Sequence, residues 1–137
     1  MSEEIKSLFQ QFVNGMNNKD NSFLDRLVDP NFIDHDPAPG QAQGLQGLKD
    51  MMQMFFTGFP DIHVTVNRLV ADGDTVAGAV TTEGTQDGDF MGIPKSGKQI
   101  SMSEMHMMRF EDGKMVEHWG IADGMTMMQQ LGVLDQE

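Results

Sequence analysis

The spacing of the apolar residues changes from helical to extended near Asp61, and this change most constrains the fold. Before Asp61, apolar residues recur at intervals of three and four, the spacing of one face of an α-helix. After Asp61, apolar Ile62, Val64 and Val66 alternate with polar residues, which is typical of a strand with one buried face. The first half of the chain is therefore predicted to be mainly helical and the second half to form a sheet.

Three helices are expected in the first half, with a short strand and a loop between the second and the third. The loop contains two prolines and two glycines, which disfavour regular structure. Asp29-Pro30 is expected to stop the second helix, and Gly58 and Pro60 the third. The expected ranges of helix, helix, strand, loop and helix are 5–16, 23–28, 32–35, 36–44 and 48–59.

Four strands and a terminal helix are expected in the second half. The strands run from Ile62 to the Asp72-Gly73-Asp74 turn, then over 75–85, 99–110 and 114–122, with helix 125–131 at the end. Helices followed by a run of strands indicate the α+β class. A curved antiparallel sheet wrapped around the N-terminal helices would make a cone-shaped barrel with an internal pocket. No repeat or linker is seen, so a single domain over 1–137 is predicted.

The charge of the chain limits its partners. The 21 acidic and 9 basic residues give a net charge of −12, which disfavours nucleic acid and anionic membranes. The absence of cysteine excludes disulfides and thiol nucleophiles. Because the N-terminal sequence lacks signal-peptide features, a cytoplasmic location is expected. A small hydrophobic organic ligand is the expected partner, and the 14 methionines would either fill gaps in the core or line an adaptable pocket.

Several short strings resemble the SnoaL-like polyketide cyclases, a group within the nuclear-transport-factor-like superfamily. No single string is diagnostic, but together they keep their order over nearly the whole chain. They include FIDHDP at 32–37, GFPD at 58–61, ADGDTVA at 71–77, GIP at 92–94, RFEDGK at 109–114 and EHW at 117–119.

This resemblance implies a curved sheet, a pocket lidded by helices and, usually, a homodimer or tetramer. The founding activity of the family is an aldol condensation that closes a ring in an aromatic polyketide without a metal or organic cofactor. Relatives in the superfamily include isomerases, dehydratases and epoxide hydrolases. The fold alone therefore does not fix the reaction.

The strand phase predicts which side chains face the pocket. Alternation places Met102, Glu104, His106 and Met108 on one face of strand 99–110, and His118 on the corresponding face of strand 114–122. The resemblance also places a pocket-lining histidine at His106. We therefore expect Glu104, His106 and His118 to converge as catalytic residues. A histidine can act as acid or base near neutrality, and a buried Glu104 would either share a proton with His106 or form an ion pair.

Further residues are candidates for contact with a ligand. Asp34 and His35 end the strand that opens near the pocket mouth in this family. Met108 and Phe56 are expected to supply apolar contacts from the sheet and from the third helix. No local spacing of ligands points to a metal, and no cofactor motif is present, so neither is expected.

Gly120 is the main departure from the resemblance. In the cyclase that names the family, an acid–base aspartate lies two residues after the histidine that matches His118, and here that position is Gly120. The nearest acid is Asp123. It either reaches the pocket through a bulge, as a fourth catalytic candidate, or caps the helix that begins at Gly124.

Two hypotheses of function follow from these residues. The first is a cofactor-independent cyclase, isomerase or dehydratase that uses acid–base chemistry on a small carbonyl compound. The second is a non-catalytic binder that holds a hydrophobic small molecule in the same pocket, with the histidines only orienting it.

Overall fold

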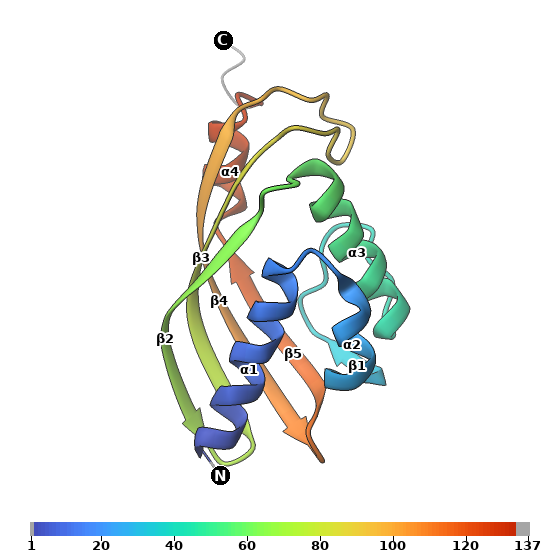
Figure 1. The fold of residues 1–137 in the computed structure, drawn as a ribbon, viewed down its shortest axis with the longest axis vertical. Coiled ribbons are helices and arrows are strands. Elements are labelled where there is room, and N and C mark those ends of the chain that lie inside the picture. The colour runs from blue at the N-terminus through green and yellow to red at the C-terminus, as the bar shows by residue number, and fades with distance from the viewer. Residues whose placement is uncertain (1, 134–137) are drawn as a thin grey trace.

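The computed structural model describes residues 2–133, which fold into helices and strands in the α+β order expected from the sequence (Figure 1). In chain order the elements are α1 (Ser2–Asn17), the short 3-10 helix η1 (Asn21–Phe23), α2 (Leu24–Leu27), β1 (Val28–Asp34), α3 (Gly44–Gly58), β2 (His63–Asp72), β3 (Thr75–Thr85), β4 (Gln99–Glu111), β5 (Lys114–Ala122) and α4 (Gly124–Gln130). None of the helices within 2–133 is long and apolar enough to cross a membrane.

The sheet is mixed and open. Its strand order is β1-β5-β4-β3-β2. The pairs from β2 to β5 are antiparallel, as expected for consecutive strands joined by hairpins, whereas β1 pairs with β5 in parallel. The sequence predicted a curved antiparallel barrel. The structure differs in two ways: the edge strand β1 is parallel to its neighbour, and the sheet does not close into a barrel. β1 reaches β5 after α3 and three strands, so no tight turn sets its direction.

The first edge strand also begins earlier than predicted. The helical stretch ends at Leu27, and β1 starts at Val28 rather than at Phe32. Pro30 therefore lies inside the strand. Proline lacks a backbone N–H, but it is tolerated where a strand has a free edge, and β1 is an edge strand.

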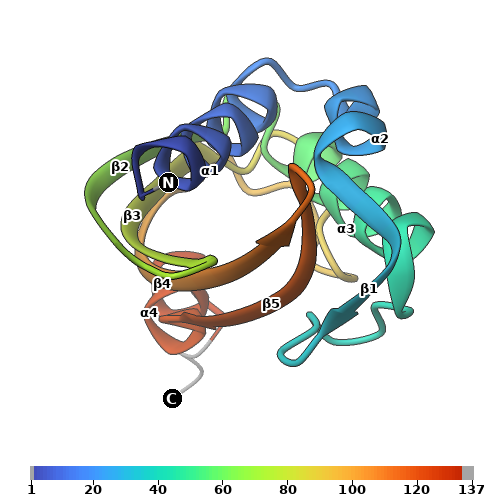
Figure 2. The ribbon, with the colours of Figure 1, turned by 90° about the horizontal axis from the view of Figure 1, so that it is seen from below.

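The helices α1, α2 and α3 lie on the concave side of the sheet. Figure 2 shows strands β2 to β5 curving into an arc whose open side these helices cover. On β4 the even-numbered side chains at both ends are buried in the core, namely Ile100, Met102, Met108 and Phe110. The intervening even-numbered residues, Glu104 and His106, therefore point toward the same concave side.

Methionine fills much of this core and also part of the surface. Met52, Met102, Met108, Met115 and Met127 are buried in one cluster with the core phenylalanines. This finding agrees with the first of the two roles considered for the methionines, the filling of gaps in the core. Other methionines, including Met105 on β4 and Met125 on α4, are exposed.

Phe9 anchors α1 to the sheet and provides a test of this packing. It is 1% exposed, and its ring lies over Gly78 of β3, where an added Cβ would come within 2.5 Å of Phe9 Cζ. Phe9→Ala is expected to lower the free energy of unfolding by about 3–5 kcal/mol, because it leaves a cavity in the core. Urea unfolding measures this loss. The matched control Gln10→Ala, at an exposed position of the same helix, should change it by less than about 0.5 kcal/mol.

Candidate active site

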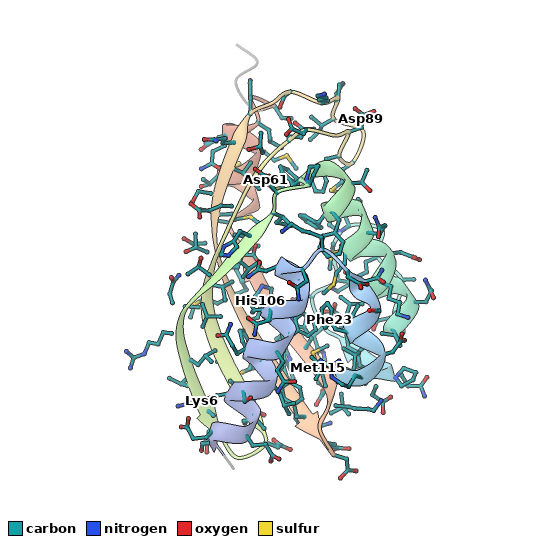
Figure 3. The ribbon with its side chains drawn as sticks, viewed as in Figure 1. Lys6, Phe23, Asp61, Asp89, His106 and Met115 are labelled. Atoms are coloured by element: carbon teal, nitrogen blue, oxygen red, sulfur yellow. The ribbon has the colours of Figure 1, made fainter. Side chains whose placement is uncertain are left out.

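Four titratable side chains from three strands form one hydrogen-bonded row on the concave face. Glu104 Oε1 lies 2.6 Å from His106 Nε2, and His106 Nδ1 lies 2.9 Å from His118 Nε2. His118 Nδ1 in turn lies 2.9 Å from Asp34 Oδ1. The row therefore runs from β4 across β5 to β1, and its two ends are carboxylates. Figure 3 labels His106 near the middle of the sheet.

Strand register brings these four residues together. His106 is opposite Gly120 on β5, and His118 is opposite Met108 on β4, so the two histidines are diagonal neighbours on one face. Asp34 is the partner of His118 in the parallel pair of β1 and β5. The predicted convergence of Glu104, His106 and His118 is thus what the geometry shows. Their catalytic role remains a prediction.

Exposure differs along the row. The side chains of Glu104, His106 and His118 are 13%, 25% and 15% exposed, whereas that of Asp34 is only 3% exposed. His106 is therefore the member of the row that solvent reaches most easily. Asp34 forms the buried end.

Asp34 is held in its ionised form by its hydrogen bonds. Its carboxylate accepts from His118, from the backbone N–H of Asp36 at 3.1 Å and from the side-chain amide of Gln41 at 3.1 Å. Burial raises the pKa of Asp34. The hydrogen bonds and the attraction of His118 outweigh it, so the pKa lies below that of a free aspartate.

The two glutamines of the 36–44 loop were missed by the sequence analysis. Gln41 bonds the Asp34 carboxylate, and Gln43 bonds both the N–H and the C=O of Asp34 at 3.0 and 2.9 Å. They hold the loop against the end of β1 and fix the Asp34 side chain. Nothing in their spacing distinguishes them from ordinary loop amides, so the only signal was their position next to Asp34.

Gln86 is a third amide with a structural role. It is fully buried, donates to the C=O of Ile93 and accepts from the Ser96 hydroxyl, and so organises the loop over 87–98.

His35 lies on the other face of the sheet from the row. Its ring stacks on Trp119 at a centroid distance of 4.7 Å, and its Nε2 lies 2.9 Å from Glu117. Because Glu117 and Trp119 alternate with His118 along β5, these contacts place His35 on the convex face. Hydrogen bonds from His35 and then Arg109 lower the pKa of Glu117. The expected contact of His35 with a ligand in the pocket does not fit this placement.

Asp123 forms the N-cap of α4, the second of its two predicted roles. Its Oδ1 accepts from the backbone N–H of Thr126 at 3.1 Å, and its Oδ2 accepts from the Thr126 hydroxyl at 2.6 Å. These bonds also lower the pKa of Asp123. Both carboxylate oxygens are therefore engaged at the helix start, so the catalytic role proposed for Asp123 is not supported by its position.

The two predicted apolar contacts are both buried. Met108 is 3% exposed and lies on the concave face opposite His118 in register, next to the row. Phe56 on α3 is 7% exposed and belongs to the core cluster. Met108 is thus placed beside the candidate site, whereas Phe56 packs within the core.

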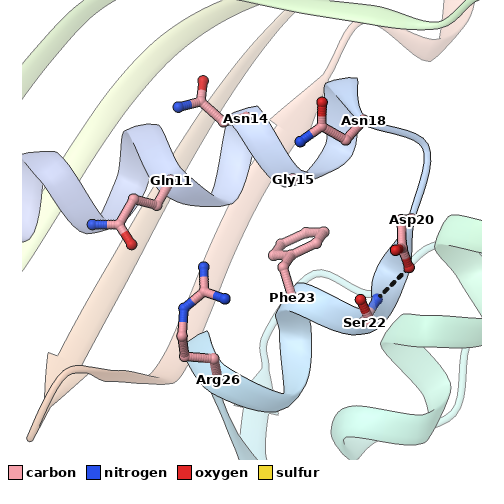
Figure 4. A pocket seen from close by; sticks show the side chains of 8 residues that line it. All are labelled: Gln11, Asn14, Gly15, Asn18, Asp20, Ser22, Phe23 and Arg26. Atoms are coloured by element: carbon pink, nitrogen blue, oxygen red, sulfur yellow. Dashed lines mark hydrogen bonds between the residues drawn. The ribbon is translucent and has the colours of Figure 1, made fainter.

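Two surface depressions lie away from the row. One of about 390 Å³ lies between α1 and the η1–α2 segment, where Gln11, Phe23 and Arg26 are among its lining residues (Figure 4). Another of about 430 Å³ lies where β2, β3, β4 and α4 meet, and Asp61, His63 and Gln130 are among its lining residues. Glu104, His106, His118 and Asp34 are not among the residues that line either depression.

Within residues 2–133, no group of three or more imidazole and carboxylate side chains is arranged to hold a metal ion. The four nitrogens of His106 and His118 are instead all engaged with each other or with carboxylates. The arrangement suits the sharing and transfer of protons.

A curved sheet whose concave side is covered by helices places the protein in the α+β class predicted above. The family model of the SnoaL-like polyketide cyclases matches residues 6–131 of the chain. The chain therefore belongs to the SnoaL-like polyketide cyclase family.

Solved structures agree with this assignment. TsrD from Streptomyces laurentii is 28% identical and superposes with a TM-score of 0.87, with 96% of this chain and 97% of TsrD covered. IdmH from Streptomyces antibioticus is 34% identical with a TM-score of 0.80, with 93% of this chain and 98% of IdmH covered. Among characterised sequences, the aklanonic acid methyl ester cyclase DauD of Streptomyces sp. (strain C5) is 22% identical over 109 residues, which are 80% of this chain and 66% of DauD.

The pKa of Asp34 gives a prediction of stability against pH. Because the folded pKa lies below the unfolded value of about 3.9, the stabilisation from Asp34 is present above that value and is lost as pH falls through the folded pKa. Asp34→Asn should lower the free energy of unfolding at pH 7 by about 1.5–3 kcal/mol, since hydrogen bonds to a charged group are replaced by neutral ones.

Urea unfolding of both proteins at a series of pH values measures this effect. The difference between wild type and Asp34→Asn should shrink as pH falls below about 4. If the difference in free energy of unfolding stays constant down to pH 2, the charge of Asp34 does not contribute to the stability of the fold.

Proposed function

We propose that the chain is an acid–base catalyst that closes a ring in, or isomerises, a small carbonyl compound. The observation that carries this proposal is the row Glu104–His106–His118–Asp34, with the buried carboxylate of Asp34 at one end and the partly exposed His106 bonded to Glu104 at the other.

The row must hold one proton beyond those of two neutral imidazoles. Its three hydrogen bonds require three protons, one in each bond, and two neutral imidazole rings supply only two. Asp34 is an unfavourable place for the third, because its pKa is lowered. The extra proton therefore belongs to the two histidines and Glu104. A site with one mobile proton between an imidazole and a carboxylate can both accept and donate a proton.

Ring closure by an aldol step requires both of these transfers. The unprotonated member of the Glu104–His106 pair removes the proton next to a substrate carbonyl. The resulting carbanion attacks a second carbonyl of the same molecule, so that one carbon–carbon bond forms and an alkoxide develops. The alkoxide then takes a proton from the pair, and the proton count of the row returns to its starting value. His106 is the group best placed to meet the substrate, because its side chain is the most exposed of the four.

The relatives support the chemical class but not a particular substrate. DauD is named as a cyclase of aklanonic acid methyl ester, a reaction that joins two parts of one molecule. Met108 beside the row and the core phenylalanines would favour an apolar substrate body.

A non-catalytic binder of a hydrophobic small molecule is the second candidate. The observation that favours it is Gly120, because the resemblance places an acid–base aspartate at that position. In this version the histidine row orients a carbonyl oxygen by hydrogen bonding and no bond is made.

Replacement of His106 separates the two candidates. His106→Gln replaces the imidazole by an amide, which can form hydrogen bonds but cannot gain or lose a proton near neutral pH. The rate at which the variant turns over a diketone ester that wild type cyclises should therefore fall by roughly 10²–10⁴-fold. The loss of substrate absorbance measures the rate. His63→Gln is the matched control, since His63 is exposed on β2 and lies outside the row, and it should retain the wild-type rate.

Two outcomes would count against catalysis by His106. Equal turnover by His106→Gln and wild type would remove His106 from the mechanism. Binding of the same compound by wild type, detected calorimetrically, without any product after long incubation would support the binder instead.

A further inference from the structure

Gly120 lies where the rings of the two histidines meet. A Cβ placed at ideal geometry on Gly120 would lie 2.7 Å from His106 Nδ1. The same Cβ would lie 3.0 Å from Cε1 and 3.1 Å from Nε2 of His118. The first distance is shorter than real contacts of a Cβ allow, so one ring would have to move.

Movement of either histidine ring would break a hydrogen bond at its other nitrogen. His106 is held at its other nitrogen by Glu104 at 2.6 Å, and His118 is held at its other nitrogen by Asp34 at 2.9 Å. Asp34 is itself fixed by the Asp36 N–H and by Gln41. A side chain at position 120 would therefore break the contact between the histidines rather than shift the row as a whole.

The backbone at Gly120 does not itself require glycine. Gly120 is absent from the residues with positive φ, and it lies within β5 opposite His106. Its N–H donates to Asp36 Oδ2 at 2.9 Å, a bond that any residue except proline could make. The need for glycine at this position is thus one of space.

We propose that Gly120 is a positioning residue for the candidate active site, because its missing side chain lets His106 bond His118 and so connects His106 to the buried Asp34. This inference rests on the proposed function and deepens it. Ionised Asp34 can only accept, so His118 donates from Nδ1 and, when neutral, accepts at Nε2 from His106 Nδ1–H. Nε2 of His106 is then the nitrogen that exchanges a proton with Glu104 or a substrate.

The contact can be measured directly by NMR without any substrate. In protein labelled with ¹⁵N-histidine, the hydrogen bond between His106 Nδ1 and His118 Nε2 should give a scalar coupling between the two nitrogens. Gly120→Ala should abolish this coupling and turn the single His106 tautomer into a mixture. Gly124→Ala is the matched control, since Gly124 follows β5, has no positive φ, and has open space around its Cβ position. It should retain the coupling.

The expected and contradicting results are distinct. Wild-type protein without the coupling, or a coupling that persists unchanged in Gly120→Ala, would overturn the proposal. If the coupling behaves as expected and wild type turns over no carbonyl compound, the positioning role is supported as a structural fact and the proposed function fails. For an active enzyme, Gly120→Ala should lower kcat more than it changes KM.

A second measurement applies if Gly120→Ala folds poorly. The shift of the urea midpoint caused by Gly120→Ala should be large in the wild-type background and much smaller in a His106→Ala background, where the ring that makes the shortest contact is gone. Equal shifts in the two backgrounds would show that contact between the added methyl group and His106 is not the cause, and would overturn the proposal.

Discussion

The parallel pairing of β1 with β5 is the interaction on which the candidate site depends. It places Asp34 opposite His118, and only 3% of the Asp34 side chain is exposed there. A carboxylate removed from water in this way is costly unless its hydrogen bonds are complete. His118, Gln41 and the Asp36 N–H complete them, so the pairing of the edge strand, the closure of the 36–44 loop and the orientation of His118 form one cooperative unit. Loss of any one of these partners would leave the buried charge with fewer hydrogen bonds.

The alternation of side chains along β5 separates two charged clusters by the thickness of the sheet. His118 faces the concave row, whereas Glu117 and Trp119 face the convex side, where His35 and Arg109 meet them. The backbone joins the two sides, since the N–H of His35 donates to the C=O of His118 at 2.9 Å. A slip of one residue in the register would exchange the clusters and bury Glu117 in place of His118. The buried Met115 of β5 and the complete hydrogen bonds of Asp34 both oppose this slip.

The sequence predicted the parts of the fold that depend on local pattern. The α+β order, the bounds of β3 and β5, and the common face of Glu104 and His106 all follow from a period of two or of three to four. Alternation could not reveal that β1 pairs in parallel with β5, because register between distant segments is not encoded in spacing. For this reason the bond between Asp34, expected as a ligand contact, and His118 was not predicted. His35 lies on the opposite face from Asp34, as neighbouring residues of an extended segment do. Two roles were predicted for Asp123, and its hydrogen bonds to Thr126 show that it caps α4.

Glycine at position 120 has an electrostatic consequence as well as a steric one. The row already contains two carboxylates, Asp34 and Glu104, and Asp36 bonds the backbone N–H of Gly120. A further acidic side chain at position 120 would bring a like charge close to these groups in a partly buried setting, where charges are poorly screened. It would also occupy the space between the histidines. A side chain at 120 and the bonded pair of histidines therefore compete for the same space, and a chain that keeps the bonded pair is expected to keep the glycine.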